Sequence, residues 1–189
     1  MRIYFKTLIT LLCLATVFVF TAFAGETHKH HKLRAQQPAY FSTPDSVSAD
    51  SILNFAETLI GTRYRSACSD PERGFDCSGF VSYVFKNFNF SVPRSSCEFI
   101  NIGEKIRLED AKPGDIILFT GTKKHTRRIG HVGIVYSNNG DDFKFIHSTS
   151  GKEHGVTITA MDKTYKRRFV QIIRVLKQND EVFASAVNQ

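Results

Sequence analysis

Residues 74–81 read Gly74-Phe75-Asp76-Cys77-Ser78-Gly79-Phe80-Val81, and this stretch predicts the start of a helix. An aspartate at position 76 can accept hydrogen bonds from the free N–H groups of a first helical turn, which places Cys77 inside that turn. The apolar residues that follow recur at helical spacing. They are Phe80, Val81, Val84, Phe85 and Phe88. Cys77 precedes this apolar stripe, so we expect it at the start of the helix and outside the core.

A cysteine in the first turn of a helix is well placed for nucleophilic chemistry. The free backbone N–H groups and the positive end of the helix dipole stabilise a thiolate. Together with a cationic partner they lower the pKa of a thiol from ~8.5 to roughly 3.5–7.5. The small neighbours Ser78 and Gly79 leave the turn open to a substrate. A buried structural cysteine is the alternative, but such a residue would more often lie on the apolar stripe. We therefore predict that Cys77 is a nucleophile.

Helical patterns come first along the chain, and strand patterns follow. One helix is predicted from Ser48, as its N-cap, to Gly61, and a shorter one from Ser95 to about Asn101. After Pro113-Gly114 the pattern changes to strands. They are predicted at Ile116–Gly121, His131–Ser137, Phe143–Thr149, Gly155–Ala160 and Phe169–Leu176. This order predicts an α+β domain in which N-terminal helices pack on a C-terminal antiparallel sheet.

Two histidines of the predicted sheet can serve the thiol as base and as orienting group. If Ser137 pairs with Phe143, then Gly133 pairs with His147 in the neighbouring strand. His131 then stands diagonally from His147 on the same face, within reach of a long side chain. A slip of one residue would place the two imidazoles on opposite faces. Two unrelated strand histidines are the alternative.

The two ends of the chain differ from the predicted domain, which spans residues 48–176. Residues 1–24 combine a basic start, an apolar run and an Ala-x-Ala end, which predicts a cleaved secretory signal peptide. An uncleaved membrane anchor is the alternative. Residues 25–47 are polar and lack an apolar period, which indicates a linker, and residues 177–189 form a polar tail.

Composition narrows the class of partner. The 189-residue chain has 25 basic and 18 acidic residues and a formal net charge of +7. A basic exported protein is attracted to acidic polymers. Export also separates it from most nucleic acid, so we expect an anionic wall polymer or a carboxylate-rich peptide as partner. No nucleic acid and no stable membrane insertion after signal cleavage are expected.

A histidine cluster in the linker offers a different function, that of an exported metal-binding protein. Its members are His28, His30 and His31. A closed metal site needs about four fixed ligands, and a solvated linker does not supply them. We therefore predict no metal ion and no cofactor.

Five segments, in this order, resemble the NlpC-type family of cell-wall cysteine peptidases. They are Gly74–Val81, Pro93–Ser96, Lys112–Asp115, Gly130–Ile134 and Phe145–Ser148. The resemblance covers about residues 50–176 and implies a papain-like α+β fold. It implies that Cys77 is the nucleophile, His131 its base and His147 the group that orients His131. It also implies that the hydroxyl of Tyr64 lies near the oxyanion site.

The resemblance implies a substrate as well. Family members commonly hydrolyse D-glutamyl–diamino-acid bonds or related cross-links in peptidoglycan stem peptides, which implies an enzyme in the periplasm or outside the cell. The motif segments imply substrate contacts for Asp76, Ser78, Arg94, Ser95 and Ser96. Arg94 could hold a carboxylate with two hydrogen bonds. A catalytically idle wall-binding protein of the same fold is the alternative, although all three catalytic positions are filled.

Three cysteines follow the predicted cleavage site, and an odd number in an oxidising compartment leaves one thiol free. Cys68 stands where similar proteins often have glycine, and Cys97 follows the Ser95-Ser96 pair on the other side of the expected cleft. A disulfide between Cys68 and Cys97 would leave Cys77 free. The alternative, given equal weight, is that both are small apolar residues without a bond.

Overall fold

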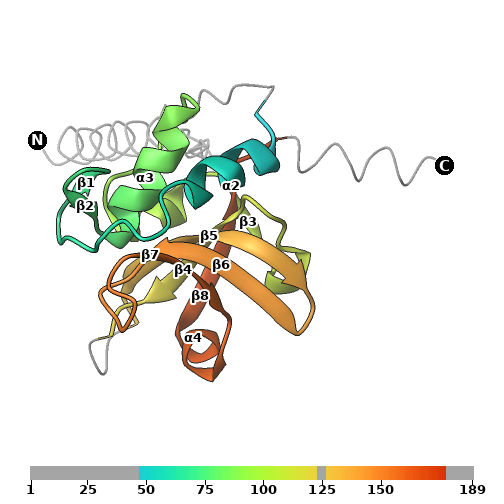
Figure 1. Cartoon of the computed structure of the whole chain (residues 1–189). Helices are drawn as coiled ribbons and strands as arrows, with labels where there is room; N and C mark the ends of the chain where they lie inside the picture. The colour runs from blue at the N-terminus through green and yellow to red at the C-terminus, as the bar shows by residue number, and fades with distance from the viewer. Residues whose placement is uncertain (1–46, 123–126, 178–189) are drawn as a thin grey trace, which may run out of the picture. The chain divides into compact units, whose positions relative to one another are not determined.

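Six antiparallel strands form the sheet on which the domain is built (Figure 1). The computed structural model describes residues 47–122 and 127–177, which belong to the second of the two units of the chain, Gln37–Gln189. The strand order is β3-β8-β4-β5-β6-β7. The strands are β3 Glu104–Ile106, β4 Ile116–Thr120, β5 Ile129–Asn139, β6 Asp142–Ser148, β7 Val156–Ala160 and β8 Phe169–Arg174.

Helices cover both faces of this sheet (Figure 1). Helices α2 (Ala49–Glu57) and α3 (Cys77–Asn87) pack on one face, and the short helix α4 (Lys163–Arg168) lies against the other. The smaller elements are the hairpin β1 Ser69–Asp70 and β2 Gly74–Phe75 and the 3₁₀ helices η1 Ser96–Asn101 and η2 Leu108–Asp110. The predicted α+β domain, with N-terminal helices on a C-terminal antiparallel sheet, is confirmed.

The alternation of side chains along the central strands builds two hydrophobic cores. On the helix face, Ile134 of β5 and Ile146 of β6 pack with Phe80 of α3 and its neighbours. On the opposite face, residues such as Phe145 form a second core that includes Tyr165 of α4. Because side chains alternate between faces, His131 and His147 belong to the side of the sheet that bears α4.

Side-chain caps start both long helices, as the sequence predicts. The Ser48 hydroxyl accepts the backbone N–H of Ser51 at 3.2 Å, and Asp76 Oδ1 accepts that of Gly79 at 2.6 Å. The end of α2 was predicted less well, because the helix ends at Glu57 and a turn follows it up to position 61. The start of α3 therefore depends on Asp76, which leads directly into Cys77.

A β-bulge separates the turn of the β5–β6 hairpin from the end that carries His131 and His147. Ser137 pairs with Lys144, so the predicted pairing of Ser137 with Phe143 is wrong by one residue. The register shifts between Val135 and Ser137, and beyond the shift Ile134 pairs with Ile146. Continuing this pairing by one residue sets position 133 opposite position 147, as predicted. The bulge thus preserves the face on which the histidines stand.

The predicted signal peptide, nearly all of the linker and nearly all of the tail lie outside the described residues. Within the described ranges, no helix has the length and apolar character needed to cross a bilayer.

Candidate active site

Cys77 is the first residue of α3, and its position depends on close packing beneath the first turn. The Cys68 carbonyl accepts the backbone N–H of Asp76 at 2.9 Å. A Cβ atom at Gly79 would lie 2.1 Å from that carbonyl oxygen, which leaves room only for a hydrogen. Gly79 therefore allows the loop that carries Cys68 to pack directly against the helix start.

The predicted substrate contacts Asp76, Ser78 and Arg94 lie together, but they bind one another. Arg94 donates to Asp76 Oδ1 at 2.9 Å, to Asp76 Oδ2 at 2.8 Å and to the Ser78 hydroxyl at 3.0 Å. The same carboxylate caps α3, so its oxygens already have partners within the protein. The charge of Arg94 is compensated by Asp76, which argues against Arg94 as a free clamp for a substrate carboxylate.

Ser95 and Ser96 lie next to this ion pair, at the start of η1. Ser95 is exposed and precedes the helix, and Ser96 is its first residue. The Ser95 hydroxyl lies 3.2 Å from the Cys97 sulfur. Cys68 and Cys97 are both free thiols, so the prediction of a disulfide between them is wrong.

The two strand histidines form the central contact of the site. His131 Nε2 lies 2.7 Å from His147 Nδ1, so the predicted pair on one sheet face is confirmed. A Cβ atom at Gly133 would lie 3.0–3.2 Å from Ile146 O, the Phe145 ring and His147 Cβ. Glycine at position 133 thus gives His147 the room that its contact with His131 requires.

Burial keeps both imidazoles in their neutral form. Burial, helped by His147 and Arg168, lowers the pKa of His131 well below its usual value. Burial and the positive charge of Arg168 lower the pKa of His147 to about 3. Since His131 donates or accepts through Nε2 toward His147, its Nδ1 atom is the ring nitrogen that this contact does not use. A neutral His131 can accept a proton there.

The backbone N–H of Val132 acts as a hydrogen-bond donor to the thiol of Cys77. The thiol therefore lies beside the part of β5 that carries His131. Burial and the negative charge of Asp76 raise the pKa of the Cys77 thiol, and the N–H groups of Val132, Ser78 and Cys77 itself oppose this rise. The expectation of a lowered pKa from the helix start is therefore wrong for the free protein. Burial outweighs the helix terminus, and the pair rests as a thiol and a neutral imidazole.

Aromatic rings enclose the histidine pair on the side away from α3. The ring centroid of Phe145 lies 4.7 Å from that of His147, and that of Phe119 lies 5.9 Å from that of His131. Tyr165 of α4 contacts both imidazoles, with its centroid 5.8 Å from that of His147. No sequence pattern indicates the position of this ring, because α4 has only six residues and lacks an apolar repeat.

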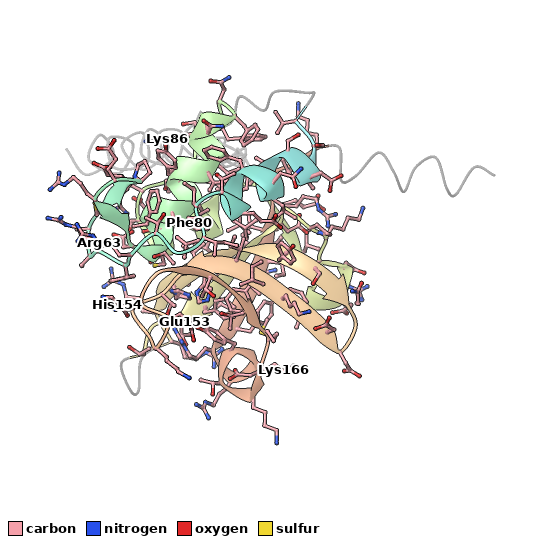
Figure 2. All side chains as sticks on the ribbon, in the orientation of Figure 1. Arg63, Phe80, Lys86, Glu153, His154 and Lys166 are labelled. Atoms are coloured by element: carbon pink, nitrogen blue, oxygen red, sulfur yellow. The ribbon has the colours of Figure 1, made fainter. Side chains whose placement is uncertain are left out.

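Tyr64 is held at the opposite side of the thiol by two backbone contacts. Its N–H donates to the His154 carbonyl at 2.8 Å, and the residue forms a parallel bridge with Phe75. Burial raises the pKa of the Tyr64 phenol, and the charges of Cys77 and Asp76 add to this effect, so the hydroxyl is near both. Figure 2 shows the neighbouring Arg63 at the same end of the domain as His154. The structure thus places the phenol of Tyr64 within reach of the charges of Cys77 and Asp76.

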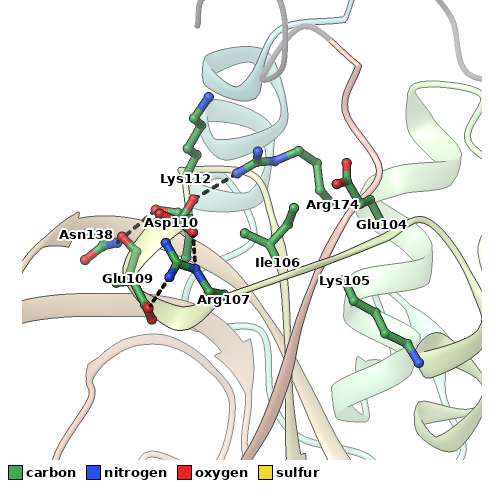
Figure 3. A pocket seen from close by; sticks show the side chains of 10 residues that line it. Glu104, Lys105, Ile106, Arg107, Glu109, Asp110, Lys112, Asn138 and Arg174 are labelled. Carbon is green, nitrogen blue, oxygen red and sulfur yellow. Dashed lines mark hydrogen bonds and ion pairs between the residues drawn. The ribbon is translucent and has the colours of Figure 1, made fainter.

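A surface hollow of about 840 Å³ lies elsewhere, between β3, η2 and the end of β8 (Figure 3). None of the predicted site residues lines it. Three of its charged groups bind one another: Arg107 pairs with Asp110 at 2.7 Å and with Glu109 at 3.3 Å. Arg174 donates to the Asp110 carbonyl at 3.0 Å. The hollow therefore offers no side chain that suits the chemistry around Cys77.

Within residues 47–122 and 127–177, no three histidine, cysteine or acidic side chains gather closely enough to hold a metal ion. The histidine cluster of the linker lies outside these ranges.

The helix that presents a thiol and the antiparallel sheet that presents a histidine pair define a papain-like domain. The chain belongs to the NlpC/P60 family, whose sequence profile matches residues 61–174, more than half of the chain. Among solved structures, a NlpC/P60 family protein from Bacillus cereus superposes with a TM-score of 0.61 at 26% identity, covering 71% of this chain and 41% of that one. The NlpC/p60 domain of the peptidoglycan hydrolase SagA gives 0.54 at 27% identity, covering 68% and 99%.

Curated relatives share about a third of their residues with this chain. The probable endopeptidase NlpC homolog of Haemophilus influenzae is 35% identical over 119 residues, which cover 62% of this chain and 57% of the relative. The murein DD-endopeptidase MepS/murein LD-carboxypeptidase of Escherichia coli strain K12 is 36% identical over 150 residues, covering 78% and 74%. The gamma-DL-glutamyl hydrolase of Bacillus subtilis is 37% identical over 123 residues, but the chain spans only 28% of its length.

Proposed function

We propose that this protein is an exported cysteine peptidase that hydrolyses peptide bonds in peptidoglycan stem peptides or cross-links. The observation that carries the proposal is the 2.7 Å contact between His131 Nε2 and His147 Nδ1, close to the thiol of Cys77. This contact orients a neutral base whose second nitrogen is available. Family membership and the peptidoglycan hydrolases among the relatives support the substrate class.

The first half of the reaction uses the neutral pair. His131 Nδ1 takes the thiol proton as the sulfur of Cys77 attacks the carbonyl carbon of the scissile bond. The N–H groups of the first turn of α3 and the hydroxyl of Tyr64 are the donors that stabilise the oxyanion. The C–N bond then breaks, and the imidazolium of His131 returns its proton to the leaving amine. An acyl group remains on the sulfur.

The second half releases that acyl group. His131 takes a proton from water as the water oxygen attacks the thioester carbon, and the C–S bond breaks. The proton then passes from His131 to the sulfur, which restores the neutral thiol. His147 stays in place as the orienting group throughout, and its own burial keeps its imidazole neutral.

The bond proposed for cleavage is the D-glutamyl–diamino-acid bond of the stem peptide. The names of the relatives include a gamma-DL-glutamyl hydrolase and murein DD-endopeptidases, so the DD cross-link is the second substrate to test. Purified stem peptides and cross-linked muropeptides should be digested separately, and the fragments should be identified by mass. Cleavage of neither substrate, together with binding of intact wall, would favour the idle wall-binding protein instead.

Matched variants test the mechanism. Cys77→Ala and His131→Ala should each abolish cleavage while leaving the thermal transition cooperative, and their losses should not add because the groups act as a unit. Cys97→Ala is the control, because it removes a thiol of η1 that has no role in the proposal. His147→Asn should retain part of the activity, since its task is orientation. Full activity in Cys77→Ala would refute the proposal.

A further inference from the structure

The Nε2 atom of His147 is a polar atom that the proposed mechanism does not use. His147 is buried, and its Nε2 atom lies 2.9 Å from the Thr159 hydroxyl oxygen. We propose that Thr159 is a positioning residue that fixes the tautomer of His147 and, through it, that of His131. This inference rests on the proposed function and extends its hydrogen-bond chain by one residue.

The protonation pattern of the two imidazoles explains why this position matters. His131 can take a proton from Cys77 only if its Nδ1 carries a lone pair, so its Nε2 must carry the hydrogen. That hydrogen is donated to His147 Nδ1, which must then be the acceptor. A neutral His147 consequently carries its own hydrogen on Nε2 and donates it to Thr159. The hydroxyl of Thr159, which can accept as well as donate, thus provides the acceptor that this productive arrangement of hydrogens requires.

The opposite arrangement would disable the base. If nothing accepted the Nε2 hydrogen of His147, that hydrogen would be buried without a partner, which is unfavourable because the protein interior offers no water to replace the lost hydrogen bond. Moving it to Nδ1 would relieve this cost, but His147 would then donate to His131 Nε2. The hydrogen of His131 would sit on Nδ1, where it cannot accept a proton from the thiol. The cost of the unpaired hydrogen is large enough to shift the balance between the two tautomers.

Protonation of His147 does not remove the need for one of these two tautomers. The groups that face its ring are His131, the phenol of Tyr165 and the positive charge of Arg168, and none of them is an anion. Phe145 covers a further side, with ring centroids 4.7 Å apart. His147 therefore stays neutral, and a neutral ring must place its single hydrogen on one nitrogen or the other.

The register of β6 and β7 provides an internal control. Thr157 is the direct partner of His147, and Thr159 is the direct partner of Phe145. The bond from His147 therefore runs diagonally to Thr159, although both threonines stand on the same face of the strand. The hydroxyl of Thr157 lies 3.5 Å from the carbonyl of Ile158. Thr157 and Thr159 thus differ in whether they contact Nε2, while their strand, residue type and face are the same.

The experiment compares three variants of the full chain: Thr159→Val, Thr159→Ser and Thr157→Val. Thr159→Val keeps the side-chain shape and removes the hydroxyl, and kcat should fall roughly 10–100-fold, by analogy with the groups that orient metal-binding histidines, with little change in KM. Thr159→Ser should recover most of kcat, and Thr157→Val should match the parent. Equal losses in Thr159→Ser and Thr159→Val would show that packing, and not the hydroxyl, matters, and would overturn the inference.

A spectroscopic measurement tests the same inference without turnover. In protein labelled with ¹⁵N at histidine, the two ring nitrogens of His147 report which one carries the hydrogen. The parent and Thr157→Val should show the hydrogen on Nε2, and Thr159→Val should show a shift of population toward Nδ1. An unchanged tautomer in Thr159→Val would overturn the role of Thr159 even if the protein cleaves peptidoglycan. If the parent cleaves no wall peptide, the proposed function fails, and this readout still decides the tautomer.

Discussion

Mild acid should destabilise this domain through its buried histidines. His147 has a pKa of about 3 in the folded protein, whereas an exposed histidine in the unfolded chain titrates near ~6.5. Between these two values the unfolded chain binds more protons, so the free energy of unfolding falls as the pH falls. At about pH 5 the loss from His147 alone is roughly 2 kcal/mol, and His131 adds a loss of the same sign. For a domain of this size that loss lowers Tm by roughly 4–8 °C.

The assay is thermal unfolding followed by circular dichroism between about pH 7.5 and pH 5. The parent should be compared with His147→Asn, which lacks the titrating ring, and with His154→Asn, which replaces an exposed histidine at a positive φ that asparagine tolerates. The curve of His147→Asn should be flatter by about 2 kcal/mol, whereas that of His154→Asn should run parallel to the parent. Parallel curves for all three proteins would refute the inference that His147 is held neutral by burial.

Three further predictions concern the supports of the site. Gly79→Ala should destabilise the domain by about 1–3 kcal/mol or more, because its methyl group would overlap the Cys68 carbonyl; an unchanged Tm would contradict the tight packing. Asp115→Ala should cost about 3–5 kcal/mol in denaturant unfolding, because it removes the carboxylate that pairs with the buried Arg174 at 2.8 Å. Peptide mapping without reductant should find every described cysteine alkylated, and a linked pair of cysteine peptides would contradict the free thiols.

The sequence predicted the parts of the fold that local chemistry determines. Ser48 and Asp76 cap their helices as expected, because an N-cap depends on one side chain and on N–H groups three residues away. The five predicted strands are present with ends that shift by at most two residues, because alternating apolar residues determine them. The histidine pair was predicted for the same reason, since position along two adjacent strands decides which side chains share a face.

Long-range contacts explain what the sequence analysis missed. Strand β3 has three residues, and it forms because Glu104 pairs with Arg174 from the far end of the chain. The bond between Arg94 and Asp76 joins residues eighteen positions apart, so Arg94 was interpreted as a free cation. The pKa of Cys77 was predicted in the wrong direction, because burial is a property of the whole fold and a helix terminus is a local one. Thr159 gave no signal, since a threonine in an alternating strand is ordinary.

The division of the proposed catalytic groups between two parts of the chain has a consequence for biogenesis. Cys77 belongs to α3, whereas His131 and His147 belong to β5 and β6, which come later in the sequence. Synthesis delivers the N-terminal part first, so a nascent polypeptide that ends before β5 contains the thiol without its base. On the proposed mechanism, such a chain is inert toward peptide bonds. On that mechanism, hydrolytic capacity arises only after β5 and β6 have been made and have packed against the helix.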